Sequence, residues 1–112
     1  MAAGIYNITI EQGSDWAMQI VVKDDGVVRN LTGYSARAQI RPRKTSSTLT
    51  GTMTCSITLP ETGAIRLQIA NAVSKLLTPG TYYWDLEIYT ANDVIVNKIL
   101  KGKAEVDAEV TR

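Results

Sequence analysis

The 112-residue chain has no histidine, no phenylalanine and a single cysteine, Cys55. Without histidine it lacks the side chain that most often serves as a general base, as a zinc ligand or as the partner of a nucleophilic Ser or Cys. A lone cysteine cannot form an internal disulfide, and its place in an alternating stretch beside Met53 and Ile57 is typical of a small buried residue. The chain also has no Gly-rich phosphate loop, G-x-S-x-G elbow or C-x-x-C pair. We therefore predict that the protein is not an enzyme and uses no metal or cofactor.

Excess charge and long apolar runs are missing as well. Twelve Lys and Arg residues nearly balance eleven Asp and Glu residues, for a net charge of +1, which gives no field to attract nucleic acid or an anionic membrane. No apolar stretch approaches the roughly 18 residues of a membrane-spanning helix. The N-terminus, Met1-Ala2-Ala3-Gly4, lacks the basic and apolar regions of a signal peptide. We expect one globular domain over residues 1–112, synthesised in the cytoplasm, without nucleic-acid or membrane partners.

Apolar residues recur at every second position over most of the chain, which predicts strands with one buried face. The expected inward positions are Tyr6, Ile8 and Ile10; Trp16, Met18, Ile20 and Val22; Tyr34, Ala36, Ala38 and Ile40; Met53, Cys55, Ile57 and Leu59; Ile65, Leu67 and Ile69; Tyr82, Trp84, Leu86 and Ile88; and Ala104, Val106, Ala108 and Val110. About eight short strands with turn signals between them predict an all-β, two-sheet antiparallel sandwich, with a closed barrel as the alternative.

Several local signals interrupt the alternation. Asp24-Asp25-Gly26 predicts a hairpin turn, and Pro42 should end the strand before it because proline has no N–H to donate. Residues 43–51 are small and polar, which favours an exposed mobile loop. Residues 70–77 space their apolar side chains at three and four, which predicts a short helical turn. Gly102 indicates a bulge or bend in the last strand.

One cluster of cations is visible in the sequence, at Arg37, Arg41, Arg43 and Lys44. These residues could meet phosphate or an acidic partner surface, or they could simply form the solvated face of a strand. Binding of nucleic acid by base stacking would need aromatic side chains interleaved with the charges, and none is present.

Tyr83, Asp85, Glu87 and Tyr89 share the outward face of one predicted strand. Paired carboxylates could serve a glycosidase, but alternation with a clear core set favours an exposed polar face. Outward tyrosines favour cross-strand packing or a subunit interface, with stacking on sugar rings as the alternative. The predicted interface residues are Tyr83, Tyr89, Arg41, Arg43 and Lys44.

Four segments carry a resemblance to a known family. They are QGSDWAMQIVVKDDGVVRNLTGYSARAQIRPR at residues 12–43, GAIRLQI, LTPGTYYWDLEI, and the closing Val110-Thr111-Arg112. In order and spacing they resemble the small immunoglobulin-like β-sandwich structural proteins of tailed bacteriophages, similar to the N-terminal domain of phage upper baseplate proteins. The resemblance covers residues 8–112 and implies an immunoglobulin-like sandwich.

The same resemblance implies a function. It points to a non-enzymatic virion protein that acts as a tail, baseplate or collar adaptor by assembling with other phage structural proteins and with copies of itself. A capsid decoration protein and a carbohydrate-binding module that aids host adsorption are the alternatives. Upper baseplate proteins continue after this domain whereas this chain stops, so we expect a stand-alone module located in the virion after synthesis in the host cytoplasm.

Overall fold

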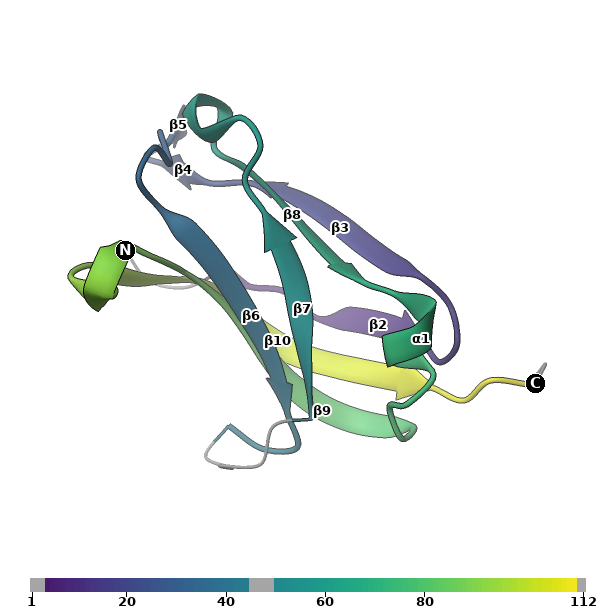
Figure 1. Cartoon of the computed structure of the whole chain (residues 1–112). Helices are drawn as coiled ribbons and strands as arrows, with labels where there is room; N and C mark the ends of the chain where they lie inside the picture. The colour runs from purple at the N-terminus through teal and green to yellow at the C-terminus, as the bar shows by residue number, and fades with distance from the viewer. Residues whose placement is uncertain (1–3, 45–49, 111–112) are drawn as a thin grey trace.

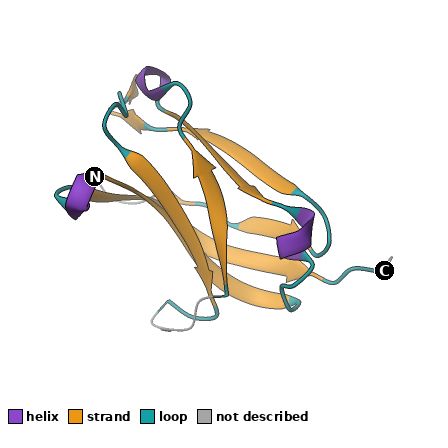
Figure 2. Cartoon of the chain, in the orientation of Figure 1, coloured by secondary structure: helices purple, strands orange, loops and turns teal. Residues whose placement is uncertain are grey.

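A computed structural model describes residues 4–44 and 50–110 of the chain. Within these ranges the protein is built mostly of strands, joined by turns and short helical segments (Figure 2). The strands are β1 (Gly4–Ile5), β2 (Ile8–Glu11), β3 (Trp16–Val21), β4 (Lys23–Asp24), β5 (Val27–Val28), β6 (Ser35–Arg41), β7 (Gly51–Ser56), β8 (Ala64–Ile69), β9 (Gly80–Tyr89) and β10 (Val96–Asp107). The helical segments are η1 (Pro60–Thr62), α1 (Asn71–Ser74) and η2 (Ala91–Asp93). The predicted all-β class is confirmed, and α1 lies inside the segment predicted to be helical.

Eight strands form one sheet in the order β1-β10-β9-β6-β7-β8-β3, with β2 also paired to β10, and β4 and β5 form a separate two-stranded sheet. Strand β7 changes partner along its length, because Met53 pairs with β6 and Cys55 pairs with β8. The sheet curls, so that inward side chains of β8 and of β9 meet in one buried cluster (Figure 1). Both halves of the curled sheet therefore enclose a single core.

The core follows the predicted alternation through most of the chain. Its buried members include Ile8 and Ile10; Ala38 and Ile40; Ile65, Leu67 and Ile69; Trp84, Leu86 and Ile88; and Ala104 and Val106. Trp84 is only 3% exposed, and Trp16 packs against the cluster while remaining partly exposed. Both tryptophans thus lie on the inner side, as predicted.

The alternation fails near both ends of the chain and after β7, where Leu59 was predicted to face inward but is 58% exposed. Tyr6 was predicted to face inward, but it is 50% exposed because it lies in the gap between β1 and β2. Ala108 and Val110 were also predicted to be inward, but β10 ends at Asp107 and both residues are exposed, Val110 to 90%. A side chain beyond the last paired residue has no sheet to hold it against the core, so these predictions were wrong.

The predicted turns are present where the structure describes them. Asp25 and Gly26 both have positive φ, 50° and 78°, and form the two-residue hairpin between β4 and β5. Strand β6 ends at Arg41, directly before Pro42. Of the loop predicted at residues 43–51, residues 45–49 lie outside the described part of the chain, and Gly51 belongs to β7.

A buried serine joins α1 to the corner between β2 and β3. The Ser74 hydroxyl donates a hydrogen bond to the Ser14 carbonyl oxygen at 2.7 Å and accepts one from the Gly13 N–H at 3.1 Å. Asp15 Oδ1 accepts the backbone N–H of Asn71 at 2.7 Å, which satisfies a donor in the first turn of the helix. Although α1 is short, these contacts fix it across one end of the sheet.

Gly102 has a different role from the one predicted. The irregularity in the pairing of β10 with β9 lies between Lys98 and Leu100, not at Gly102. Gly102 instead allows a close approach of the N-terminal segment, because a Cβ added there would lie 2.1 Å from the Tyr6 carbonyl oxygen. That oxygen accepts the indole N–H of Trp84 at 2.9 Å, so the glycine lets the chain pass close enough to satisfy a buried donor.

Candidate functional site: the outer face of β6, β9 and β10

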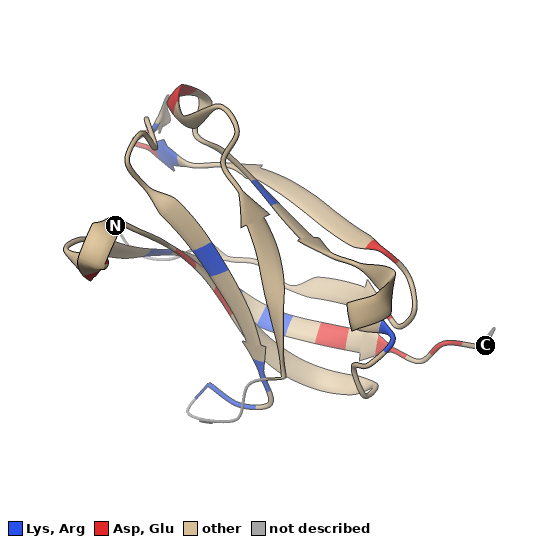
Figure 3. Ribbon diagram, viewed as in Figure 1, with Lys and Arg blue, Asp and Glu red and all other residues tan. Residues whose placement is uncertain are grey.

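The polar side chains of three neighbouring strands form a continuous surface, which we call the outer face. It consists of Arg37, Gln39 and Arg41 on β6; Tyr83, Asp85, Glu87 and Tyr89 on β9; and Lys98, Lys101 and Lys103 on β10. The register places Arg37 opposite Glu87, Gln39 opposite Asp85 and Arg41 opposite Tyr83. By contrast, β3 and β7 contain no charged residue, and charged bands are visible on β6 and β10 (Figure 3).

An irregularity in β10 adds two lysines to this face. Strict alternation would put Lys98 and Lys101 on opposite sides of the strand. The register shifts between Lys98, which pairs with Glu87, and Leu100, which pairs with Leu86, so the intervening Ile99 is an extra residue. Ile99 is buried, and Lys98 and Lys101 are both exposed on the same side as Glu87 and Asp85.

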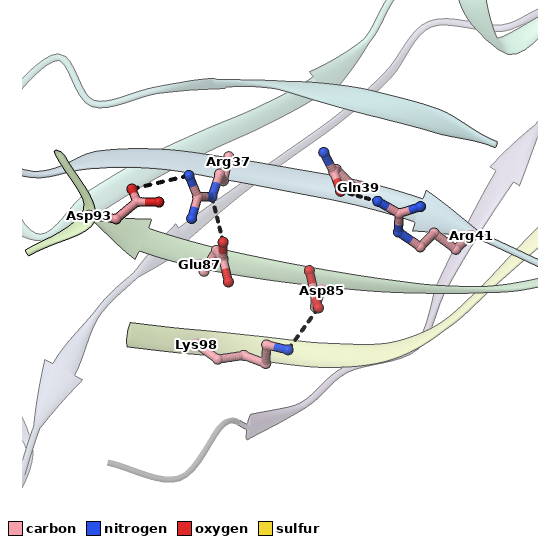
Figure 4. A network of polar contacts seen from close by, with 7 residues as sticks. All are labelled: Arg37, Gln39, Arg41, Asp85, Glu87, Asp93 and Lys98. Carbon is pink, nitrogen blue, oxygen red and sulfur yellow. Dashed lines mark hydrogen bonds and ion pairs between the residues drawn. The ribbon is translucent and has the colours of Figure 1, made fainter. Parts of the chain in front are cut away.

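One end of the outer face is organised around Arg37. Its guanidinium donates to Glu87 Oε1 from Nε and lies 3.4 Å from Asp93 Oδ1 through Nη1 (Figure 4). The guanidinium carbon also sits 4.3 Å from the centroid of the Tyr89 ring. The hydrogen bond to Glu87 is the main cause that raises the pKa of Arg37. Asp93 reaches Arg37 from the turn before β10, where Asn92 and Asp93 both have positive φ. At this end one cation, Arg37, faces two carboxylates, Glu87 and Asp93.

The other end contains a shallow depression of about 310 Å³. Its lining includes Arg41, Lys44, Tyr83, Asp85, Lys98 and Lys101. Lys98 Nζ lies 2.9 Å from Asp85 Oδ2, and Arg41 Nη2 donates to Gln39 Oε1 at 2.9 Å (Figure 4). Lys44 Nζ is 5.7 Å from the centroid of the Tyr83 ring. Cations outnumber carboxylates at this end of the face.

The structure brings together three of the predicted interface residues and separates the other two. Arg41, Lys44 and Tyr83 all line the depression. Tyr89 lies six positions further along β9, about 20 Å away at the rise of an extended strand, and belongs to the Arg37 end. Arg43 is exposed and is not part of the depression's lining.

The tyrosines and carboxylates of β9 are not freely exposed. Tyr83 and Tyr89 are half-buried, and each has a cation near one ring face. Asp85 and Glu87 share a face, as predicted, and each pairs with a cation of a different neighbouring strand, Lys98 or Arg37. The outer side of β9 is thus a polar sheet surface whose side chains form ion pairs with both neighbouring strands. Lys98 and Lys101 were not among the predicted interface residues, because strict alternation puts them on opposite sides of the strand and only the register shift at Ile99 turns both outward.

Cys55 is half-buried and packs against the core. Burial raises the pKa of its thiol to about 11, so the thiol stays protonated and weakly nucleophilic at neutral pH. Among the described residues, no group of three or more His, Cys, Asp or Glu side chains is placed to hold a metal ion. Nor does any helix within residues 4–44 and 50–110 have the length and apolar character to cross a membrane.

No protein-family model matches the chain, and no curated protein matches it. Among solved structures, the chain is similar to InlP of Listeria monocytogenes, with 11% sequence identity and a TM-score of 0.49 over 91% of this chain and 26% of that one. It is also similar to CopC from Methylosinus trichosporium OB3b, with 11% identity and a TM-score of 0.47 over 100% of this chain and 90% of that one. At these scores neither likeness identifies a family or a function.

Proposed function

We propose that the chain is a non-enzymatic structural protein of a tailed-phage virion, and that it acts by binding other proteins through the outer face. The observation that carries the proposal is the outer face itself, which concentrates Tyr, Arg and Lys side chains on the central strands of the sheet. Tyr and Arg are the residue types that contribute most to binding energy in protein interfaces. The phage assignment rests on the sequence resemblance described above.

The geometry supports docking because the outer face is already ordered. Arg37 is held by Glu87 and Asp93, and Lys98 is held by Asp85. Side chains fixed in pairs on strands lose less conformational freedom when a partner binds, so more of the contact energy contributes to affinity.

We further propose that the curled sheet is an immunoglobulin-like two-layer sandwich. One layer would hold β1, β2, β10, β9 and β6, the other would hold β8 and β3, and β7 would divide its pairing between them. Within the described residues the pairing path ends at β1 and at β3 without a ladder between those two strands, which favours the sandwich over a closed barrel.

The sequence resemblance favours a tail, baseplate or collar adaptor that assembles with other phage structural proteins and with copies of itself. A capsid decoration protein is the second role. Sugar binding is less favoured by the geometry, because stacking on a sugar needs an open aromatic face, and a cation lies near one face of both Tyr83 and Tyr89.

The first test is to locate the protein on purified phage particles with a labelled antibody seen by electron microscopy. Label at the tail tip or collar is expected, and label over the capsid would favour decoration instead. Particles without label, in a preparation where a known virion protein is detected, would contradict the virion assignment.

A second test asks whether the outer face does the docking. Replacing Tyr83 and Tyr89 together with Ala should abolish incorporation into particles while the purified protein stays folded. Tyr6→Ala is the matched control, because Tyr6 is an exposed tyrosine outside the outer face. Normal incorporation of the double variant would contradict docking through this face, whereas glycan binding that is lost in the same variant would support the carbohydrate-binding alternative.

A further inference from the structure

We propose that the depression at the Tyr83 end of the outer face binds an acidic segment of the partner protein, with partner carboxylates placed among Arg41, Lys44 and Lys101. This inference rests on the proposed docking function and adds the chemistry of the partner. It follows from the charge balance of the depression, from the contrast with the Arg37 end and from the size of the depression.

The charge of the depression differs from that of the whole chain. Arg41, Lys44, Lys98 and Lys101 contribute four positive charges to its lining and Asp85 contributes one negative charge, a local balance of +3, whereas the chain carries only +1. Asp85 is already paired with Lys98 at 2.9 Å. Within the part of the chain that the structure describes, no carboxylate lies within 4.0 Å of the Lys44 or Lys101 ammonium. Lys44 and Lys101 therefore give the depression positive charge that no described carboxylate pairs.

The opposite end of the outer face shows that this excess is local. There Arg37 lies between two carboxylates, those of Glu87 and Asp93. A partner with a row of carboxylates would meet attraction at the Tyr83 end and no net attraction at the Arg37 end. The two ends of the outer face therefore differ in charge, and this difference would fix the orientation in which the partner binds.

The size of the depression suits a short peptide segment better than a nucleic acid. Its volume of about 310 Å³ is at the lower end of the range for ligand pockets and has room for a few side chains. A nucleic-acid strand would need a basic groove that follows many phosphates, with aromatic platforms for the bases. Here Asp85, Glu87 and Glu105 interrupt the positive charge on the same side of the sheet, and Tyr83 is the one aromatic side chain of the outer face at this end.

The proposal can be tested with a synthetic hexaglutamate peptide titrated into the ¹⁵N-labelled full chain, with hexaglutamine as the uncharged control. Saturable amide shifts are expected at Tyr83, Asp85 and Lys101 and not around α1, with weaker binding as salt rises from about 0.05 to about 0.2 M. Lys44→Glu combined with Lys101→Glu should weaken the affinity by about tenfold or more, because two attractive charges become repulsive. Lys23→Glu combined with Lys75→Glu changes the net charge equally at two exposed lysines outside the depression, so it is the matched control and should change the affinity less than about twofold.

Three results would overturn the proposal. One is a set of small unsaturated shifts spread over all surface lysines, Lys23 and Lys75 included. Another is an equal affinity of the double variant and the unsubstituted protein. The third is tighter binding of an oligothymidylate of similar charge, which would assign the depression to phosphate.

The same variants separate this inference from the proposed function. If hexaglutamate does not bind but the double Tyr variant still fails to enter particles, the outer face docks a partner of different chemistry and only the inference fails. If hexaglutamate binds at the depression but the protein is absent from particles, the anion site stands and the virion role fails.

Discussion

Replacing Gly102 with Ala tests how the N-terminal segment is held against β10. The new Cβ would lie 2.1 Å from the Tyr6 carbonyl oxygen and 2.7 Å from the Tyr6 carbonyl carbon. Both are backbone atoms, so no side-chain rotation can relieve the contact and the segment around Tyr6 must move. That movement would break the bond from Trp84 Nε1 to the Tyr6 oxygen, 2.9 Å, and the bond from the Tyr6 N–H to the Lys101 oxygen, 2.9 Å.

The expected loss follows from these two bonds. A buried indole N–H left without an acceptor costs about 1–3 kcal/mol, and the second hydrogen bond contributes about 1 kcal/mol. Alanine also restricts the unfolded chain, which returns about 0.4–1 kcal/mol. We therefore expect the free energy of unfolding to fall by about 2 kcal/mol, which corresponds to a decrease in Tm of about 10 °C for a domain of this size.

Urea unfolding followed by tryptophan fluorescence at 25 °C measures this change. Gly51→Ala is the matched control, because Gly51 also lies in a strand and its added Cβ would only touch the Leu77 side chain, at 3.4 Å. That control should stay within about 0.5 kcal/mol of the unsubstituted protein. In a Trp84→Phe background, Gly102→Ala should cost about 1 kcal/mol less, since no indole donor is left unpaired. Equal stability of Gly102→Ala and Gly51→Ala would refute the reasoning.

Two further predictions concern buried side chains. Ser74→Ala removes a hydroxyl with 0% exposure that serves Ser14 and Gly13, and it should lower the free energy of unfolding by about 1–2 kcal/mol in the same urea assay, whereas Ser56→Ala should have little effect. An unchanged stability of Ser74→Ala would show that α1 does not depend on this serine. Burial raises the pKa of the Cys55 thiol from 9.0 to about 11, so the unfolded chain loses its thiol proton first, and the contribution of this group to stability should decline as pH rises through that interval. The difference in unfolding free energy between the unsubstituted protein and Cys55→Ala should therefore narrow between about pH 9 and 11, and a difference independent of pH would contradict the buried thiol.

The fold was predictable where the signals are local. Alternation identified the inward residues of β8 and β9 without error, because a strand buried on one face must repeat with period two. The Asp25-Gly26 hairpin was predictable because few residue pairs accept positive φ at both positions. The pairing of β2 with β10 in parallel was not predictable, because those segments lie at opposite ends of the chain and nothing local specifies their contact. The same missing information led to the errors at Tyr6, Ala108 and Val110.

The candidate site was predictable only in part, for a related reason. Tyr83 on β9 lies directly opposite Arg41 on β6. This contact depends on β6 and β9 being adjacent in the sheet, and the order of strands could not be predicted from the sequence. Tyr89 and Tyr83 were predicted to belong to one interface because both point outward, but the length of β9 places them at different ends of the outer face. The sequence therefore predicted which side chains point outward, but not which of them lie close together.

The positive charge of the depression depends on a local departure from the period of two. The extra residue Ile99 turns into the core and allows Lys98 and Lys101 to share the outer side, where Lys98 compensates Asp85 and Lys101 keeps its charge unpaired by any described carboxylate. Without the bulge, one of the two lysines would point toward the core, and either the pair with Asp85 would be lost or the positive charge of Lys101 would be missing from the depression. A β-bulge disrupts the hydrogen-bond ladder locally, so it does not strengthen the pairing of β10 with β9. Its effect here is on the surface, where it adds a positive charge to one end of the outer face, and this cationic end is the feature that a partner of opposite charge would recognise.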